Sequence, residues 1–228
     1  MKYQALMLDF YGTLAREDEE PSKQVLQQVC RASVSGPAAE EVGREWTRHF
    51  VGLCDAAYGE SFRTQREVGL ASVRSLYAHY GVAASDVEAA CEIMFERCWR
   101  RPTAFEDVAG FLARLRLPVC IVSNVDEDDL RAALRHLGWR FDLIVTSESA
   151  RSYKPRPEMF RQALALLGVL PEAALHVGDS FSSDVIGARG AGIAAAWLNR
   201  RGRPLLPGPA QPTYDVRDLR EVEAILQR

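Results

Sequence analysis

The 228-residue sequence lacks several features that point to particular classes of protein. It has no basic excess, because 28 Lys+Arg face 31 Asp+Glu, and this balance gives no electrostatic footprint for nucleic acid. Its five cysteines form no CxxC pair, which is typical of a reducing compartment. The first apolar run, Ala5–Leu8, is too short for a signal peptide or a membrane span. We therefore expect a cytoplasmic protein, monomeric or homodimeric, that acts on a small molecule and binds neither nucleic acid nor membrane.

What the sequence does contain is a series of short apolar runs, each bounded by turn or cap residues. Such runs are typical of buried parallel strands, and several are followed by a helical pattern. The predicted strands are Ala5–Leu8, Val119–Val122, Leu143–Val145, Leu175–Val177 and Ile193–Leu198. Together they predict an α/β fold with a Rossmann-like parallel sheet. Asp9, Ser123 and Asp179 each close a strand, at the sheet edge where such folds place catalytic residues.

A long stretch between the first two strands has amphipathic helical periodicity and no strand pattern. The predicted helices are Ser22–Val34, Ala38–Tyr58, Ser61–Tyr80 and Ser85–Arg100. We assign residues 16–102 to an inserted all-helical cap domain, and residues 1–15 and 103–228 to the α/β core domain. Aromatic residues at helical spacing are predicted to form the core of the cap: Phe62, Tyr77, Tyr80, Phe95 and Trp99. In the core domain, further helices are expected over Phe105–Leu115 and Asp218–Gln227.

Four short motifs carry the chemical signal. Asp9 ends the first strand ahead of a glycine turn, and Ser123 ends the second, where its hydroxyl can donate to an anionic oxygen. Lys154 lies next to a proline and precedes a helix, while Asp179 and Asp184 form a pair of acids that suits a hard divalent cation. Each motif alone has a structural explanation, such as a turn aspartate or a solvated lysine. The order of all four is what favours an active site.

In that order and context, the motifs in residues 4–14 and 118–198 resemble the haloacid dehalogenase superfamily. The resemblance implies a parallel sheet between helices, with a helical cap inserted after the first strand. It implies that Asp9 is the nucleophile, and that Ser123 and Lys154 hold the transferring group and offset its developing charge. Asn124, next to Ser123, is expected to share in substrate binding.

The resemblance also implies a Mg²⁺ cofactor. Its expected ligands are Asp9, the backbone carbonyl of Tyr11, and Asp179. Asp184 is expected to be either a further ligand, directly or through water, or an acid that orients Lys154. Magnesium is needed because an anionic carboxylate must approach an anionic phosphoryl group.

Tyr11 departs from the pattern of the family's phosphatases, which have an aspartate two residues after the nucleophile. That aspartate protonates the leaving oxygen and then activates water, and a tyrosine with a pKa near ~10 is a poor base at neutral pH. The Asp-x-Tyr-Gly-Thr variant resembles instead the 2-haloacid dehalogenases, which need no metal and use a cap arginine near the halide. Five cap arginines are candidates for that role: Arg31, Arg44, Arg48, Arg63 and Arg66.

Three functions follow from these observations. The Gly178–Asp179 pair favours a Mg²⁺-dependent phosphatase or phosphotransferase that acts on a phosphoric monoester or acyl phosphate, with Tyr11 among its catalytic residues. The alternative is a 2-haloacid dehalogenase that uses the same Asp9 nucleophile. A second alternative is a catalytically weak protein that keeps the fold for binding or regulation.

Overall fold

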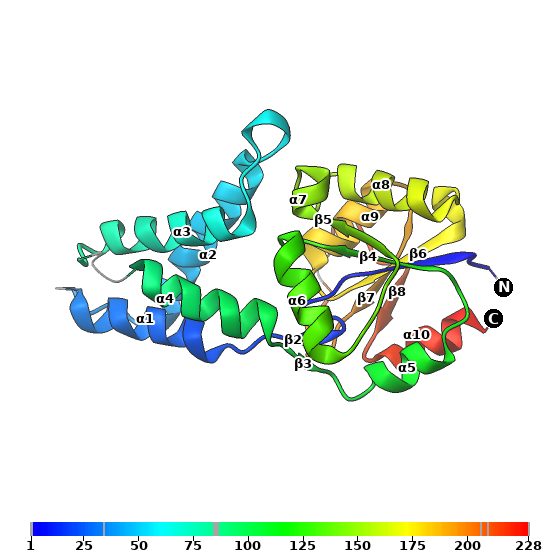
Figure 1. The fold of residues 1–228 in the computed structure, drawn as a ribbon, viewed down its shortest axis with the longest axis horizontal. Helices are drawn as coiled ribbons and strands as arrows, with labels where there is room; N and C mark the ends of the chain where they lie inside the picture. Colours follow the sequence, from blue (N-terminus) through cyan, green and yellow to red (C-terminus); the bar gives the residue numbers. More distant parts are fainter. Residues whose placement is uncertain (1, 34, 84–86, 206, 209, 228) are drawn as a thin grey trace.

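A six-stranded parallel sheet forms the centre of the computed structural model, which describes residues 2–33, 35–83, 87–205, 207–208 and 210–227 (Figure 1). The strand order is β5-β4-β1-β6-β7-β8. The strands are β1 (Ala5–Leu8), β4 (Val119–Ser123), β5 (Leu143–Thr146), β6 (Ala174–Gly178), β7 (Ala194–Leu198) and β8 (Tyr214–Val216). The central position of β1 between β4 and β6 brings three motif-bearing strands side by side. The fold class is therefore the α/β class that the sequence predicts.

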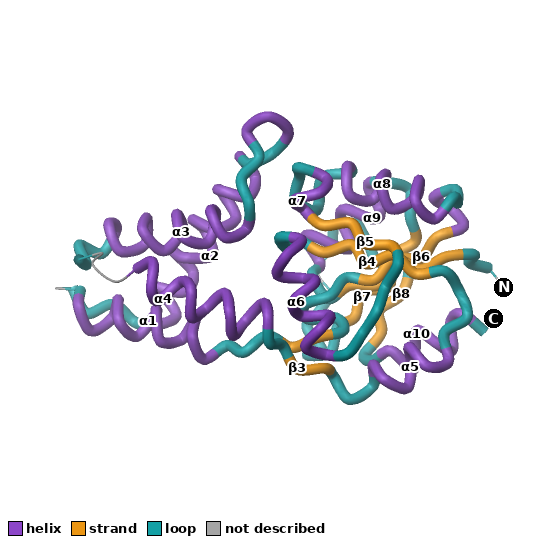
Figure 2. The backbone as a smooth tube through the Cα atoms, viewed as in Figure 1, coloured by secondary structure: helices purple, strands orange, loops and turns teal. Residues whose placement is uncertain are grey.

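Helices cover both faces of the sheet, as the alternating side chains of β1 require. Leu6 and Leu8 pack into the hydrophobic cluster on one face, and Met7 packs into the cluster on the other. The first face is covered by α5 (Val108–Arg114), α6 (Glu127–Leu137) and α10 (Leu219–Leu226). The second face is covered by α8 (Glu158–Leu167) and α9 (Ile186–Gly190), while the short helix α7 (Ser147–Ala150) follows β5 (Figure 2).

Four helices lie to one side of this sandwich, at the left of Figure 1. They are α1 (Glu20–Ala32), α2 (Ala39–Ala56), α3 (Gln65–His79) and α4 (Val87–Met94), and α4 continues into a π-helical segment, Phe95–Arg100. These helices bury a cluster of their own, which includes Tyr77, Phe95 and Trp99, with Tyr80 packed against it. A two-stranded antiparallel ribbon, β2 (Ala15–Arg16) and β3 (Thr103–Ala104), joins them to the sheet domain. Our division of the chain into cap and core follows this arrangement and stays a proposal.

Several helix ends differ from those the periodicity predicts. The helix α3 begins at Gln65 rather than Ser61, because Thr64 and Glu67 form a reciprocal capping box there. The helix α5 begins at Val108 rather than Phe105. Val34 and residues 84–86, at the predicted ends of two helices, lie outside the described residues. One aromatic residue of the predicted cap core is also misplaced, since Phe62 stacks on Tyr153 of the sheet domain at 5.5 Å between ring centroids.

Acidic residues at the start of α6 connect the two parts of the chain. The carboxylate of Asp126 accepts hydrogen bonds from the backbone N–H groups of Gln65 and Arg66 at 2.6 and 2.9 Å. The guanidinium of Arg66 donates two hydrogen bonds to the buried carboxylate of Asp129, at 2.8 and 2.9 Å. These contacts fix the amino-terminal end of α3 over the carboxyl edge of the sheet.

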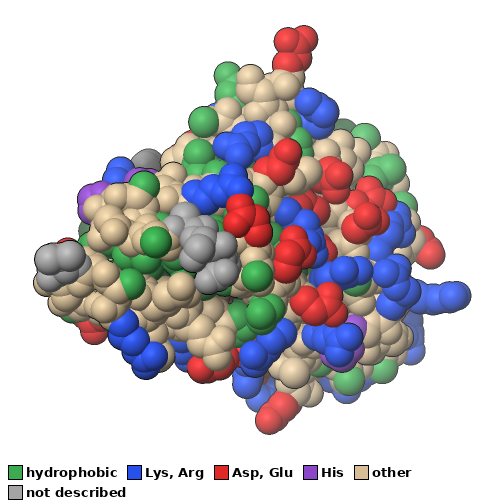
Figure 3. Space-filling model, turned by 60° about the vertical axis from the view of Figure 1, so that its left-hand side comes forward, with side chains coloured by type: hydrophobic (Ala, Val, Ile, Leu, Met, Phe, Trp, Pro, Cys, Tyr) green, Lys and Arg blue, Asp and Glu red, His purple; other side chains and the backbone are tan. Residues whose placement is uncertain are grey.

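The surface carries charges of both signs. On the face that Figure 3 shows, lysine and arginine side chains are interspersed with aspartate and glutamate. Among the described residues, no helix is long and apolar enough to cross a membrane. Cellular location, oligomeric state and the absence of nucleic-acid partners stay predictions from the sequence.

Candidate active site

Asp9 lies at the carboxyl end of β1, where the chain leaves the sheet and turns. Its side chain is buried, and its Oδ2 atom accepts a hydrogen bond of 2.9 Å from the hydroxyl of Thr13. Its Oδ1 atom accepts one of 2.8 Å from Lys154 and a longer one of 3.4 Å from Ser123. Burial raises the pKa of Asp9, and the Lys154 ammonium opposes that shift. The carboxylate is thus held at both oxygens in one orientation.

Lys154 is a buried cation between two buried carboxylates. Its Nζ atom donates hydrogen bonds to Asp9, to Asp184 at 2.6 Å, and to the backbone oxygen of Val122 at 2.8 Å. Burial lowers the pKa of Lys154, but Asp184 and Asp9 outweigh it and the net shift is upward. Asn124 accepts from the Lys154 backbone N–H at 2.8 Å and donates to its carbonyl at 3.3 Å. The predicted substrate-binding side chain of Asn124 thus holds the lysine segment in place.

Asp184 is the most strongly held acid of the site. Burial works against its charge, but Lys154 and His176 hold the pKa of Asp184 well below its usual range. The Nε2 atom of His176 lies 2.9 Å from Asp184 Oδ1, and the Ser180 backbone N–H donates to Oδ2 at 3.0 Å. A Cβ atom at Gly178 would fall 2.2 Å from the Asp184 carboxyl carbon, so only glycine fits at that position.

Asp179 completes a group of three acids that fits a hard cation. One carboxylate oxygen from each of Asp9, Asp179 and Asp184 can be chosen so that all lie within 4.8 Å of one another. Burial, with Asp9 and Asp184 nearby, raises the pKa of Asp179 to about 7. A Cβ atom at Gly12 would lie 2.5 Å from the Asp179 carboxyl group, so the glycine turn leaves room for it. Oxygen donors in this number and proximity are those that Mg²⁺ prefers.

The hydroxyl of Tyr11 is engaged away from this group. It donates a hydrogen bond of 2.5 Å to the backbone oxygen of Trp99, in the π-helical segment that follows α4. Burial raises the pKa of Tyr11 well above its usual value, and Glu17 and Asp129 add to the shift. The neutral hydroxyl therefore links the helical region to the sheet domain.

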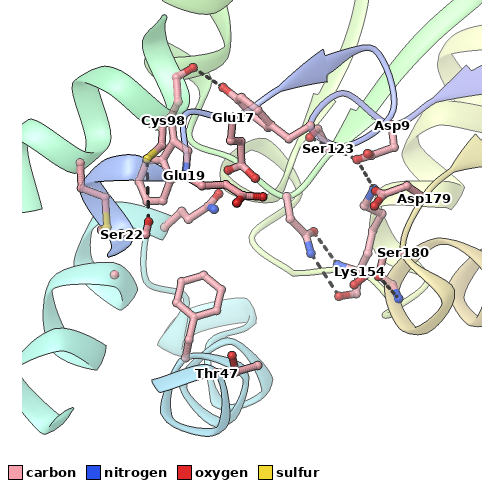
Figure 4. A pocket seen from close by; sticks show the side chains of 18 of the residues that line it. Asp9, Glu17, Glu19, Ser22, Thr47, Cys98, Ser123, Lys154, Asp179 and Ser180 are labelled. Atoms are coloured by element: carbon pink, nitrogen blue, oxygen red, sulfur yellow. Dashed lines mark hydrogen bonds and ion pairs between the residues drawn. The ribbon is translucent and has the colours of Figure 1, made fainter. Parts of the chain in front are cut away.

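A cavity of about 510 Å³ opens between the sheet edge and the helices, a size suited to a small molecule (Figure 4). All seven predicted site residues line it: Asp9, Tyr11, Ser123, Asn124, Lys154, Asp179 and Asp184. On the opposite side, its lining includes Glu17, Trp46, Phe50 and Trp99.

Sequence reasoning missed three residues near this centre. Thr13 lies within the quoted first motif, and its spacing of four from Asp9 was the available signal. His176 lies within the fourth motif, but its position inside a buried strand gave no sign of its contact with Asp184. Glu17 stands in a polar segment where nothing in the pattern distinguishes it from its neighbours.

Residues 3–192 match the family model for haloacid dehalogenase-like hydrolases, and the chain belongs to this family. A phosphoserine phosphatase of Thermus thermophilus is 40% identical over 133 residues, which cover 56% of this chain and 53% of that protein. A (S)-2-haloacid dehalogenase of Pseudomonas putida is 25% identical over 229 residues, which cover 96% of each chain. The chain spans about half the length of the first four curated relatives it matches.

Solved structures agree on the fold. The crystal structure of an L-2-haloacid dehalogenase superposes with a TM-score of 0.79 at 21% identity, with 100% of both chains covered. At 21% identity, this similarity supports the haloacid dehalogenase-like fold but does not distinguish a phosphatase from a dehalogenase. That choice depends on the residues of the site.

Proposed function

We propose that this chain is a Mg²⁺-dependent hydrolase of phosphate esters or acyl phosphates, with Asp9 as the nucleophile. The observation that carries the proposal is the grouping of Asp9, Asp179 and Asp184 within 4.8 Å. Lys154 supplies one positive charge to these three carboxylates, which leaves an excess of negative charge in a largely buried place. When bound, Mg²⁺ offsets the charge of the nucleophile and of the phosphoryl group that it must approach.

In this proposal, the residues around Asp9 fix its direction of attack. Thr13 and Lys154 hold the two carboxylate oxygens, so the side chain is oriented before the substrate binds. Ser123 and Lys154 donate to the oxygens of the transferring group. Asp184 keeps Lys154 charged, and the backbone contacts of Asn124 keep it in place.

Dehalogenation is the second candidate, because the dehalogenase relative aligns over 96% of this chain. That chemistry uses the same aspartate to displace halide from carbon, and the resemblance implies a cap arginine beside the halide. None of the five candidate arginines lines the cavity within the described part of the chain. Arg48 pairs with Glu45, and Arg66 pairs with Asp129. Lys154 is the sole lysine or arginine among the described lining residues, and it already contacts two carboxylates. The described lining therefore offers no arginine for the position beside a halide.

A substrate panel separates the candidates. Acetyl phosphate, p-nitrophenyl phosphate, alkyl phosphates and 2-chloropropionate are each incubated with the protein, with Mg²⁺ or with a chelator. We expect phosphate release that requires Mg²⁺ and that is lost in an Asp9→Asn variant. Halide release that a chelator does not affect would establish the dehalogenase instead. Slow turnover of every compound would favour the binding or regulatory protein.

A further inference from the structure

A phosphate-ester hydrolase must supply a proton to the leaving oxygen, and the hydroxyl of Tyr11 is bonded to Trp99 instead. We propose that Glu17 donates this proton and then accepts one from the attacking water. This inference rests on the proposed function and goes beyond it, because it names a catalytic residue outside the four motifs.

The position of Glu17 is the first support. Glu17 follows directly after β2, at the junction between the sheet domain and the helices, and it lines the same cavity as Asp9 and Asp179. Figure 4 shows its carboxyl group pointing into the space between the helical region and these two aspartates. Trp99, whose backbone oxygen accepts a hydrogen bond from Tyr11, lines the same cavity.

The lack of a counter-ion is the second support. The neighbouring acids are both neutralised, since Asp18 pairs with Arg97 at 2.5 Å and Glu19 pairs with Lys23 at 3.2 Å. In the part of the chain that the structure describes, no lysine or arginine pairs with Glu17. Neither a lysine nor an arginine among the described residues therefore holds this carboxyl group in its charged form. A proton donor must be uncharged before it acts.

The surroundings of Glu17 suit proton transfer near neutral pH. Desolvation by the surrounding protein atoms raises the pKa of Glu17 to about 7, although the residue keeps an exposed surface. Asp9 and Glu19 add to the shift, and the Trp99 side chain opposes it. The titratable groups around it are Asp9, Tyr11, Cys98 and Glu19.

In this proposal, hydrolysis proceeds in two steps. An Asp9 carboxylate oxygen forms a bond to phosphorus while the bond from phosphorus to the leaving oxygen breaks, and the Glu17 proton passes to that oxygen to give an alcohol. Glu17 is then a carboxylate. It takes a proton from water as the water oxygen bonds to phosphorus and the bond to Asp9 breaks. Phosphate leaves, and Asp9 and protonated Glu17 are restored.

A Glu17→Gln variant tests the proposal through leaving-group dependence. We expect kcat/KM for an alkyl phosphate to fall by about 10²–10⁴, the usual contribution of a general acid. For acetyl phosphate, whose leaving group is stable as an anion, kcat/KM should change little. With p-nitrophenyl phosphate the variant should release one nitrophenolate per site in a burst, because the second step lacks its base.

The pH profile gives an independent readout. The donor must be protonated, so kcat/KM of the unmodified protein on an alkyl phosphate should fall as pH rises through about 7. Glu17→Gln should remove this descending limb. Glu19→Gln is the matched control, since Glu19 lines the same cavity two residues away but is paired with Lys23, and it should keep the profile.

Three results would show that Glu17 is not the proton donor even though the protein is a phosphatase. They are an equal loss on acetyl and alkyl phosphates, an unchanged alkyl activity, and an unchanged pH profile. Introducing Tyr11→Asp into the Glu17→Gln variant places an acid at the family's usual position, and alkyl phosphatase activity should recover. If the unmodified protein releases phosphate from none of these compounds, the proposed function itself has failed.

Discussion

A Tyr11→Phe substitution separates a structural role of Tyr11 from a catalytic one. The structure shows its hydroxyl donating a 2.5 Å hydrogen bond to the backbone oxygen of the buried residue Trp99. Loss of this bond leaves a carbonyl oxygen without its partner, so we expect destabilisation of about 2 kcal/mol. For a chain of this size that corresponds to a decrease in Tm of roughly 4–8 °C. Activity on a phosphate ester should change by less than about tenfold, well below the general-acid contribution.

Thermal unfolding and steady-state kinetics on the same preparations provide the measurement. The matched control is Tyr153→Phe, because the Tyr153 hydroxyl also donates to a backbone oxygen across the two parts of the chain, that of Arg63 at 2.9 Å. The two variants should lose similar stability and keep similar activity. A rate decrease of a hundredfold or more for Tyr11→Phe alone would identify its hydroxyl as the proton donor and refute our reasoning.

Three further substitutions test the site. Lys154→Met leaves the buried carboxylates of Asp9 and Asp184 without their cation, so the free energy of unfolding in urea should fall by about 3–5 kcal/mol. An unchanged free energy of unfolding would contradict a stabilising role of these ion pairs. Asp179→Asn should weaken Mg²⁺ binding, measured by calorimetry, by more than ~10-fold, which is the smallest effect usual for residues that only hydrogen-bond to a metal ligand. The control Asp128→Asn, at an exposed position, should leave Mg²⁺ binding unchanged. Gly12→Ala should displace the Asp179 carboxyl group and abolish Mg²⁺ binding. The control is Gly138→Ala, because Gly138 has a similar positive φ but no atom within 4 Å of an added Cβ, so this change should lower stability without affecting Mg²⁺ binding. Equal loss of Mg²⁺ binding in the two variants would refute a clash between a Cβ added at Gly12 and the Asp179 side chain.

The sheet and its catalytic edge were predictable because they depend on local patterns. The strand β1 has the bounds that its apolar run indicates. Asp9, which follows β1, and Ser123, which ends β4, line one cavity. Parallel strands bring their carboxyl ends to the same edge, so proximity of Asp9 and Ser123 follows from topology. For the same reason, the sequence could place Asp9 of the first motif near Asp179 of the fourth as possible ligands of one metal ion.

Contacts across the two parts of the chain were not predictable, because no local period encodes them. Phe62 has the helical spacing of a cap-core residue but stacks on Tyr153 of the sheet domain. Glu17 lies in an acidic run, and the structure alone distinguishes it from Asp18, whose charge Arg97 neutralises. The first three acids after β2 all line the cavity, and which of them lacks a basic partner depends on contacts that the sequence pattern does not encode.

The most direct test of the central claim is the mass of the Asp9-containing peptide after an acid quench during turnover. The protein is supplied with acetyl phosphate and 2-chloropropionate together, with Mg²⁺ present or removed by a chelator. We expect a phosphoryl group on Asp9 that appears only with Mg²⁺. A 1-carboxyethyl ester on Asp9 that forms in the presence of chelator, with no phosphorylated peptide under either condition, would contradict this expectation.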